Sequence, residues 1–275
     1  MSVRSDTALT GVASQKNHEQ TRIVDVKNLV TQYPGNPEPT LKGVDFEVCK
    51  GEIMVIMGGS GSGKSTLLRQ LIALDPPTSG TIRLFDQDIM KIGALDLHAL
   101  RLRMGVAFQG GAMFNSMTVG ENLILPLREH LNLANSQMDI MARMKLAFVN
   151  LDIATIDKMP SELSGGMLKR AALARAIIMD PPLLFCDEPS AGLDPVVSSA
   201  IDDLIIKLRD ALEMTIVVVT HERTSAFKIA DRITILDRGN ILTVGTLDEL
   251  RSGNNKRVHD LLLGNAEDVD AATWI

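Results

Sequence analysis

The stretch IMVIMGGSGSGKST at residues 53–66 decides the fold of this chain. It opens with a continuous apolar run, which is typical of a strand buried on both faces of a sheet. A glycine-rich loop follows, and a helix is predicted over residues 65–74. The loop fits the pattern G-x-x-x-x-G-K-[ST] in the strand, loop, helix order that this pattern requires. We therefore predict a loop that binds the phosphates of a nucleotide.

The residues of this loop have distinct predicted tasks. Its glycines let the backbone turn so that successive N–H groups and the next helix N-terminus face the phosphates. Lys64 is expected to reach the β- and γ-phosphates, Ser65 to bind Mg²⁺, and Thr66 to contact the α-phosphate. The alternative, an incidental flexible loop, is disfavoured by the flanking strand and helix. The predicted nucleotide-binding residues are Gly58, Gly59, Ser60, Gly61, Ser62, Gly63, Lys64, Ser65 and Thr66.

A pair of acids ends a second apolar run, LLFC at residues 183–186. Asp187 and Glu188 would then lie at the carboxyl edge of a parallel sheet, where such sheets bind ligands. We expect Asp187 to hold Mg²⁺, directly or through water, and Glu188 to deprotonate the water that attacks the γ-phosphate. An acid pair after a strand is by itself more often a solvated helix start. The upstream loop favours the catalytic interpretation.

Two polar residues follow other predicted strands. His221 comes after the run VVVT at residues 217–220, and its imidazole could donate a hydrogen bond to the γ-phosphate. Gln109 follows the strand predicted at 105–108, and its amide could reach Mg²⁺ or the attacking water. A lone histidine after a strand is more often structural, and a loop glutamine carries no signal by itself. We include His221 and Gln109 as candidate site residues because both are expected to lie beside the nucleotide.

The composition of the chain limits the kinds of protein it can be. The chain has 275 residues, of which 45% are hydrophobic and 23% charged, so it can bury a substantial core. A net charge of −6 without any cluster of Lys and Arg argues against a nucleic-acid partner. The two cysteines, Cys49 and Cys186, form no CxxC pair and are expected to be reduced, structural thiols. No signal peptide or membrane span of about 18 apolar residues is evident, so we expect a cytosolic chain.

The rest of the sequence indicates an α/β fold. An alternating pattern interrupted by PGNP at residues 34–37 predicts an N-terminal antiparallel β subdomain. Residues 110–168 have helical spacing, with Pro126 and Pro160 as breaks, and predict an inserted α-helical subdomain. The βα alternation after it implies a mostly parallel sheet. The predicted fold is a P-loop NTPase.

Three regions follow from these patterns. Residues 1–20 are expected to be a disordered N-terminal tail, 21–252 the nucleotide-binding domain, and 253–275 a C-terminal tail. Within the domain we predict further strands at 80–84, 215–219 and 232–236, and helices at 95–103, 167–179, 196–212 and 224–230.

The motif LSGGM at residues 163–167 opens a helix rich in Arg and Ala, and here the chain closely resembles the ABC transporter ATPases. The resemblance covers roughly residues 23–250 and makes SAGLD at 190–194 the D-loop. It implies that Ser164, Gly165 and Gly166 bind the γ-phosphate of an ATP held by the partner subunit's Lys64. Two ATP molecules would thus join a head-to-tail homodimer. A purely structural capping box at 161–164 is the alternative.

The same resemblance assigns two further residues to the nucleotide. Asp194 of the D-loop is expected at the ATP site, and Tyr33 occupies the position where the family stacks an aromatic ring on adenine. Packing of Tyr33 in the turn beside Pro34 is the alternative.

Several departures from the commonest family pattern indicate which branch of the ABC transporter ATPases the chain resembles. Met167 stands where glutamine is usual, and the stretches FQGGAMF, PLREH and MPSE are distinctive. These features are similar to the ATPase subunit of MCE-type (Mla-like) phospholipid transporters of bacteria. The resemblance implies a role in lipid transport between inner and outer membranes and in outer-membrane lipid asymmetry. It also implies an integral membrane permease and an MCE-domain lipid-binding protein as partners, with the chain held at the cytoplasmic face of the inner membrane.

Other functions remain open at this stage. The ATPase of an amino-acid or metal importer shares every motor motif. A DNA-maintenance ATPase would insert a coiled coil or zinc module before residue 163, where the sequence has no sustained heptads. An ATPase acting on ribosomes would normally carry two such domains. For a transporter, we expect the permease to dock around residues 110–117, with Met113, Phe114 and Met117 as contact candidates or as core residues.

Overall fold

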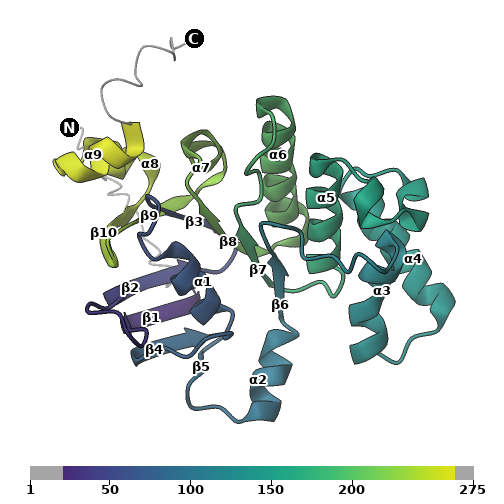
Figure 1. The fold of residues 1–275 in the computed structure, drawn as a ribbon, viewed down its shortest axis with the longest axis horizontal. Helices are drawn as coiled ribbons and strands as arrows, with labels where there is room; N and C mark the ends of the chain where they lie inside the picture. Colours follow the sequence, from purple (N-terminus) through teal and green to yellow (C-terminus); the bar gives the residue numbers. More distant parts are fainter. Residues whose placement is uncertain (1–20, 264–275) are drawn as a thin grey trace, which may run out of the picture.

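The computed structural model describes residues 21–263, whose elements are arranged as two sheets and flanking helices (Figure 1). Residues 1–20 and 264–275 lie outside the described part, and so do the predicted N-terminal tail and the end of the predicted C-terminal tail. Among the described residues, no helix has both the length and the apolar character needed to cross a bilayer.

The larger sheet has six strands in the order β10-β9-β3-β8-β7-β6. Parallel pairing joins β9 to β3, β3 to β8, β8 to β7 and β7 to β6, while β9 and β10 form an antiparallel pair. The mostly parallel sheet predicted from the sequence is confirmed. Its strands are β3 (Ile53–Met57), β6 (Met104–Ala107), β7 (Leu183–Asp187), β8 (Thr215–Thr220), β9 (Arg232–Asp237) and β10 (Asn240–Gly245).

The central strands β3 and β8 are mostly apolar because both of their faces are covered. Every residue of β3 and of β8 is buried. One face of the sheet packs on helices α5 and α6, and the other packs against α1 and the smaller sheet. A continuous apolar run is what such a position requires, since neither face meets water.

The smaller sheet is antiparallel, with strand order β2-β1-β4-β5, as the N-terminal pattern predicted. Buried residues are interspersed with exposed and half-buried ones along β1 and β2, because only one face meets the core and the register shifts locally. That core is shared with α1 and with the larger sheet. The strands are β1 (Arg22–Thr31), β2 (Leu41–Cys49), β4 (Ser79–Leu84) and β5 (Gln87–Asp88).

The helices complete the architecture, and those between β6 and β7 confirm the helical insertion. In Figure 1, α3 and α4 lie at the end of the molecule away from the smaller sheet. The described helices are α1 (Lys64–Leu71), α2 (Ala94–Arg101), α3 (Val119–His130), α4 (Asn135–Phe148), the 3₁₀ helices η1 (Ile153–Asp157) and η2 (Pro160–Glu162), α5 (Gly165–Ala176), α6 (Pro195–Leu212), α7 (Arg223–Ile229), α8 (Leu247–Ser252) and α9 (Lys256–Leu263).

The prediction that Pro126 breaks a helix is wrong, because Pro126 lies inside α3. A proline within a helix removes one backbone hydrogen bond but does not have to end the helix. Here a capping box between Thr118 and Glu121 secures the N-terminus, and Leu123 and Leu127 are fully buried on either side of the proline. Pro160 begins η2, where the absent N–H costs nothing.

The chain keeps packing beyond residue 252, where the nucleotide-binding domain was expected to end. Val258 and Leu262 of α9 are buried in the same core cluster as β3 and β8. The Arg257 guanidinium donates to both Asp237 carboxylate oxygens, at 2.9 and 3.1 Å. Helix α9 is therefore attached to the end of β9.

Gly105 in β6 offers a test of how closely α5 packs on the sheet. A Cβ at this position would lie 2.3 Å from the carbonyl oxygen of Ala176, at the end of α5. Gly105→Ala is therefore expected to lower the free energy of unfolding by about 1–3 kcal/mol, because backbone must move to admit the methyl group. The measurement is chemical unfolding of the purified protein. Gly93→Ala is the control, since its Cβ meets only Asp96 Oδ2 at 3.8 Å, and an equal loss there would contradict the prediction.

Candidate functional site

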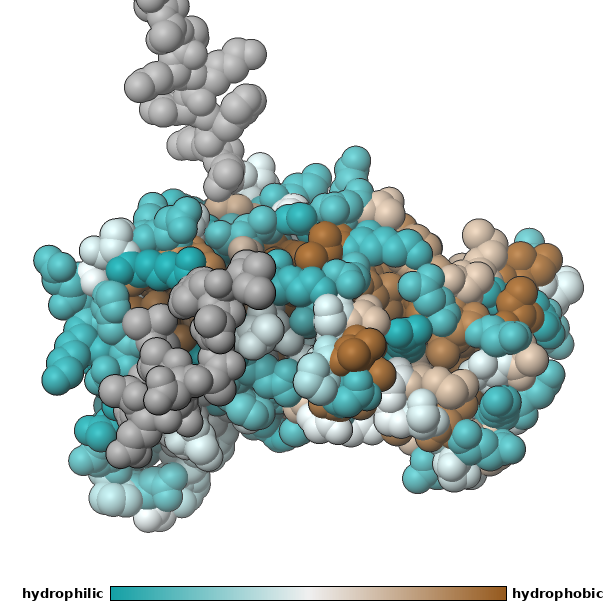
Figure 2. Space-filling view, turned by 90° about the horizontal axis from the view of Figure 1, so that it is seen from above, coloured by the Kyte–Doolittle hydropathy of each residue, from teal (hydrophilic) through white to brown (hydrophobic). Residues whose placement is uncertain are grey.

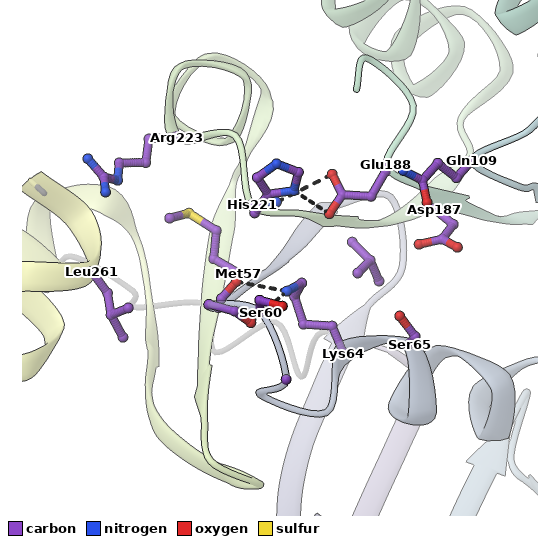
Figure 3. A pocket seen from close by; sticks show the side chains of 14 residues that line it. Met57, Ser60, Lys64, Ser65, Gln109, Asp187, Glu188, His221, Arg223 and Leu261 are labelled. Atoms are coloured by element: carbon purple, nitrogen blue, oxygen red, sulfur yellow. Dashed lines mark hydrogen bonds and ion pairs between the residues drawn. The ribbon is translucent and has the colours of Figure 1, made fainter. Parts of the chain in front are cut away.

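A cavity of about 570 Å³ opens where β3, β7 and β8 end. It brings together most of the residues that the sequence singled out, from segments far apart in the chain (Figure 3). The predicted residues that line it are Gly58, Gly59, Ser60, Gly61, Lys64, Ser65, Gln109, Asp187, Glu188 and His221.

The glycine-rich loop forms one wall of this cavity. A Cβ on Gly58 would lie 2.2 Å from the carbonyl oxygen of Leu236, so only glycine fits where the loop leaves β3. Gly63 has φ of 107° and caps α1, a conformation that glycine adopts without strain. The Lys64 ammonium donates to the carbonyl oxygens of Gly58 at 2.8 Å and Gly59 at 3.0 Å. Burial lowers the pKa of Lys64, an effect opposed by the nearby charges of Glu188 and Asp187.

Glu188 lies next to His221 in the wall of the cavity (Figure 3). Its Oε1 lies 2.7 Å from His221 Nδ1, and its Oε2 accepts a hydrogen bond from Thr220 Oγ1 at 3.0 Å. Glu188 is buried and has φ of 48°, a left-handed conformation that is uncommon for a residue with a side chain. Its N–H donates to the Val219 carbonyl at 2.8 Å, which ties the end of β7 to β8. This backbone geometry directs the carboxylate toward the His221 loop.

Asp187, Ser65 and Gln109 supply oxygen donors to the same cavity. Burial raises the pKa of Asp187, and the neighbouring Glu188 charge adds to the shift, while Lys169 and Lys64 oppose it. A carboxylate, a hydroxyl and an amide oxygen form the hard donor set that Mg²⁺ prefers in proteins. The residues present therefore fit a magnesium ion bound together with nucleotide phosphates.

Four predicted residues lie on a second cavity, of about 450 Å³, rather than on the first. Ser164 caps the N-terminus of α5, where its hydroxyl accepts a hydrogen bond from the Met167 N–H at 3.3 Å. This N-terminus lines the cavity. Such an N-terminus attracts anions. Within one chain the two cavities remain separate sites. The residues concerned are Ser164, Gly165, Gly166 and Asp194.

Some predicted residues line neither cavity. Ser62 is buried behind the loop, and Thr66 is half-buried in α1. Tyr33 is half-buried in the turn after β1, where its carbonyl accepts a hydrogen bond from the Asn36 N–H at 3.2 Å. Gly63 contributes through its backbone conformation alone.

The first cavity also includes residues that the sequence analysis missed: Met57, Val219, Arg223 and Leu261. Met57 and Val219 belong to the predicted strands and could have been found from the strand ends. Arg223 follows His221 by two residues, so a cation this close to a predicted site residue was a usable signal. Nothing in the sequence places Leu261 of α9 beside the loop, because only tertiary packing brings the chain end there.

A buried polar network lies behind the Glu188 loop. The Ser225 hydroxyl donates to Asp202 Oδ2 at 3.0 Å, and the Ser190 hydroxyl donates to Glu222 Oε2 at 3.1 Å. The two hydroxyl oxygens are 3.3 Å apart. Asp202 Oδ1 is buried and has no hydrogen-bond partner among the described residues. Burial raises the pKa of Asp202 to about 6.

Asp202 predicts a pH dependence of stability. The folded carboxyl has a pKa of about 6 and its ordinary value is 3.8, so the folded state holds the proton more tightly. Stability therefore falls as the pH rises from 3.8, and the loss is complete above about pH 6. The amide introduced by Asp202→Asn cannot ionise, so between about pH 5 and pH 8 the wild type should lose about 1 kcal/mol of unfolding free energy relative to this variant. Parallel pH profiles for the two proteins in chemical unfolding would contradict this.

The sequence of this chain matches a known protein family. The family model described as ABC transporter matches residues 41–191. The chain is 38% identical to the "Intermembrane phospholipid transport system ATP-binding protein MlaF" of Haemophilus influenzae, over 89% of this chain and 92% of that protein. It is 40% identical to the protein of the same name from Escherichia coli, over 82% of this chain and 83% of the relative. A "Probable ribonucleotide transport ATP-binding protein mkl" of Mycobacterium tuberculosis is 37% identical, over 84% of this chain and 66% of that protein.

A solved structure agrees with these sequence matches. The fold aligns with a dimeric post-hydrolysis state of the ATP-binding cassette MJ0796 bound to ADP and Pi, with a TM-score of 0.75 and 31% identity. The alignment covers 82% of this chain and 98% of that chain. The chain therefore belongs to the ABC transporter family, as an ATP-binding subunit that hydrolyses ATP.

Proposed function

We propose that this chain powers phospholipid transport between the inner and outer membranes of a bacterium and so maintains outer-membrane lipid asymmetry. The observation that carries the proposal is the match, along nearly the whole length of both chains, with the phospholipid-transport protein of Haemophilus influenzae. The mycobacterial relative is named for ribonucleotide transport, so relatives of similar identity are named for different transported molecules. The ATPase of an amino-acid or metal importer is the alternative. In our proposal the chain binds an integral membrane permease at the cytoplasmic face of the inner membrane, and an MCE-domain protein carries the lipid.

Glu188 is the proposed catalytic base for ATP hydrolysis. Its carboxylate is held by Thr220 and His221, so it can orient a water for in-line attack on the γ-phosphate and accept its proton. His221 is exposed enough, at 60% of its side chain, to turn toward the γ-phosphate when nucleotide enters. Gln109 contributes its amide to the same water or to the metal.

Binding of the nucleotide is assigned to the loop and to the oxygen donors beside it. Backbone N–H groups of the loop would face the phosphates, and Lys64 would exchange its two loop carbonyls for phosphate oxygens. Ser65, Asp187 and Gln109 would hold Mg²⁺, which supplies charge neutralisation at the phosphates when bound. Thr66 and Tyr33 are proposed to contact the α-phosphate and the adenine, respectively.

The second cavity supports a homodimer. The N-terminus of α5 lines a cavity that contains no residue of this chain's own phosphate loop, so in our proposal its γ-phosphate comes from a second chain. A second copy placed head to tail supplies one, and Ser164, Gly165, Gly166 and Asp194 would then close on the partner's nucleotide. The dimeric MJ0796 neighbour supports this arrangement.

The permease is proposed to dock at residues 110–117, directly after Gln109. The side chain of the fully buried Asn122 holds this loop: it accepts from the Phe114 N–H at 2.7 Å and donates to the Phe114 and Met117 carbonyls at 3.1 and 3.2 Å. Phe114 itself is 52% exposed on this fixed backbone, while Met113 is half-buried against the core. Figure 2 shows hydrophobic surface at the end of the molecule that holds the helical segment. A rigid loop with an exposed aromatic ring suits an apolar partner.

Replacement of Glu188 tests the catalytic assignment. Glu188→Gln keeps the size and one acceptor oxygen of the side chain but removes the base, so kcat should fall by about 100-fold or more while ATP binding persists. An ATP-bound dimer should accumulate and be visible by size-exclusion chromatography with light scattering. Glu213→Gln, at the exposed end of α6, is the control. Normal hydrolysis by Glu188→Gln would remove Glu188 from the mechanism.

Capture of the membrane complex tests both the docking loop and the cargo. Tagged wild type should retain a permease, an MCE-domain protein and phospholipid, identified by mass spectrometry of the complex. Phe114→Asp should lose the permease, because it would bury a charge against an apolar partner. Leu95→Asp is the matched control, since Leu95 is 86% exposed on α2. A solute permease in place of the MCE-domain protein would refute lipid transport and leave the ATPase assignment intact.

A further inference from the structure

Lys169 has no role in the proposed chemistry, yet it touches the backbone of two residues that do. Its ammonium donates to the Gln109 carbonyl and, at 3.0 Å, to the Glu188 carbonyl. The side chains of these same two residues line the first cavity. The chain positions of Gln109 and Glu188 are far apart, and among the described contacts the Lys169 ammonium bridges them directly.

The lysine is held in this place at an energetic cost. Burial lowers the pKa of Lys169, while the charges of Asp187, Glu188 and Glu222 oppose that shift. Both hydrogen bonds of the ammonium go to carbonyl oxygens, which satisfy its donors without neutralising its charge. A half-buried ammonium between two loops, with acidic groups nearby, is typical of a group that fixes a site rather than of a surface charge.

The helix that carries Lys169 also carries the second cavity. Ser164, Gly165 and Gly166 begin α5 and line the second cavity, and Lys169 follows on the same helix. Further along α5, Arg175 donates to the carbonyls of Gly111 at 3.1 Å and Ala112 at 2.7 Å. Two cations of one rigid helix thus hold the loop after β6, and only Lys169 of these two also reaches Glu188.

We propose that Lys169 is a positioning residue of the nucleotide site: its ammonium ties the backbone of Gln109 to that of Glu188, so that their side chains keep their places together. The inference rests on the proposed roles of Gln109 and Glu188. It follows that any displacement of α5 by nucleotide at the second cavity reaches both residues of the first cavity at once. Lys169 acts through its neighbours and touches neither ATP nor the attacking water.

The first test is kinetic, in the full-length protein. Lys169→Met removes the ammonium at nearly equal length, and it should lower kcat by about 10- to 100-fold with little change in the KM for ATP, because the reacting groups are misplaced while the phosphate loop is intact. Lys207→Met is the matched control: Lys207 also donates to a carbonyl, that of Phe148 at 3.0 Å, and lies outside both cavities. A kcat of Lys169→Met equal to that of Lys207→Met would overturn the proposal.

The second test does not depend on hydrolysis. Amide hydrogen exchange of Lys169→Met without nucleotide should accelerate in residues 109–112 and in residues 188–191 together. Arg175→Met should accelerate exchange in the first segment alone, because Arg175 does not reach Glu188. Acceleration in only one segment of Lys169→Met would refute the tie between the two loops.

Chemical rescue separates a positioning role from general loss of structure. Lys169→Cys alkylated with bromoethylamine regains an ammonium on a side chain of lysine length. Cys49 and Cys186 are buried, and burial raises the pKa of both thiols, that of Cys186 to about 12, so they are poor competitors for the reagent. A single adduct by mass spectrometry should restore most of the lost kcat. No recovery in a folded, singly alkylated protein would overturn the proposal.

These outcomes are distinguishable from failure of the proposed function. Wild type and Glu188→Gln are assayed first under the same conditions. If Glu188→Gln hydrolyses ATP normally, the assignment of Glu188 fails, whatever Lys169 does. If Glu188→Gln is inactive and Lys169→Met retains wild-type kcat and exchange, the positioning role alone is wrong.

Discussion

Three parallel strands, β3, β8 and β7, lie side by side at the centre of the large sheet, and the nucleotide cavity depends on where they end. Val55 of β3 is opposite Val218 of β8, which is in turn opposite Cys186 of β7. With this register, the loops that follow the three strands meet at one edge. The glycine-rich loop, the acid pair and His221 are thereby brought into one cavity. A shift of one residue in any of these pairings would turn every side chain of that strand to the other face.

Charge in the cavity is arranged so that no group is left buried alone. Asp187 and Glu188 would repel each other, and Lys64 and Lys169 lie near enough to lower the pKa that burial raises at Asp187. Lys64 belongs to the phosphate loop and makes its present bonds to loop carbonyls that a nucleotide can replace. Lys169 belongs to α5 and donates to the backbone carbonyls of Glu188 and Gln109. Lys64 is thus available to bind the nucleotide, whereas Lys169 helps to hold the backbone around the site.

Helix α5 connects parts of the molecule that would otherwise be independent. Its N-terminus lines the second cavity, its cationic side chains hold the loop after β6, and it packs in the core against the large sheet. Asn122 of α3 holds the continuation of that same loop, where Phe114 is exposed. The nucleotide edge and the proposed docking surface are therefore joined by short, polar contacts to a single segment, which is the physical basis for coupling between them.

The sequence by itself determined the sheet and the identity of the chemical groups. Apolar runs mark strands buried on both faces, and the loop at 58–65 has a backbone geometry that its glycines impose, since Gly58 admits no Cβ. These are local constraints, which a linear pattern records. Tertiary structure alone decided that Leu261 of α9 reaches the cavity, that Pro126 is accommodated inside α3, and that Lys169 bridges Gln109 and Glu188. Each of these depends on contacts between residues far apart in the chain, whose energies no single stretch of sequence contains.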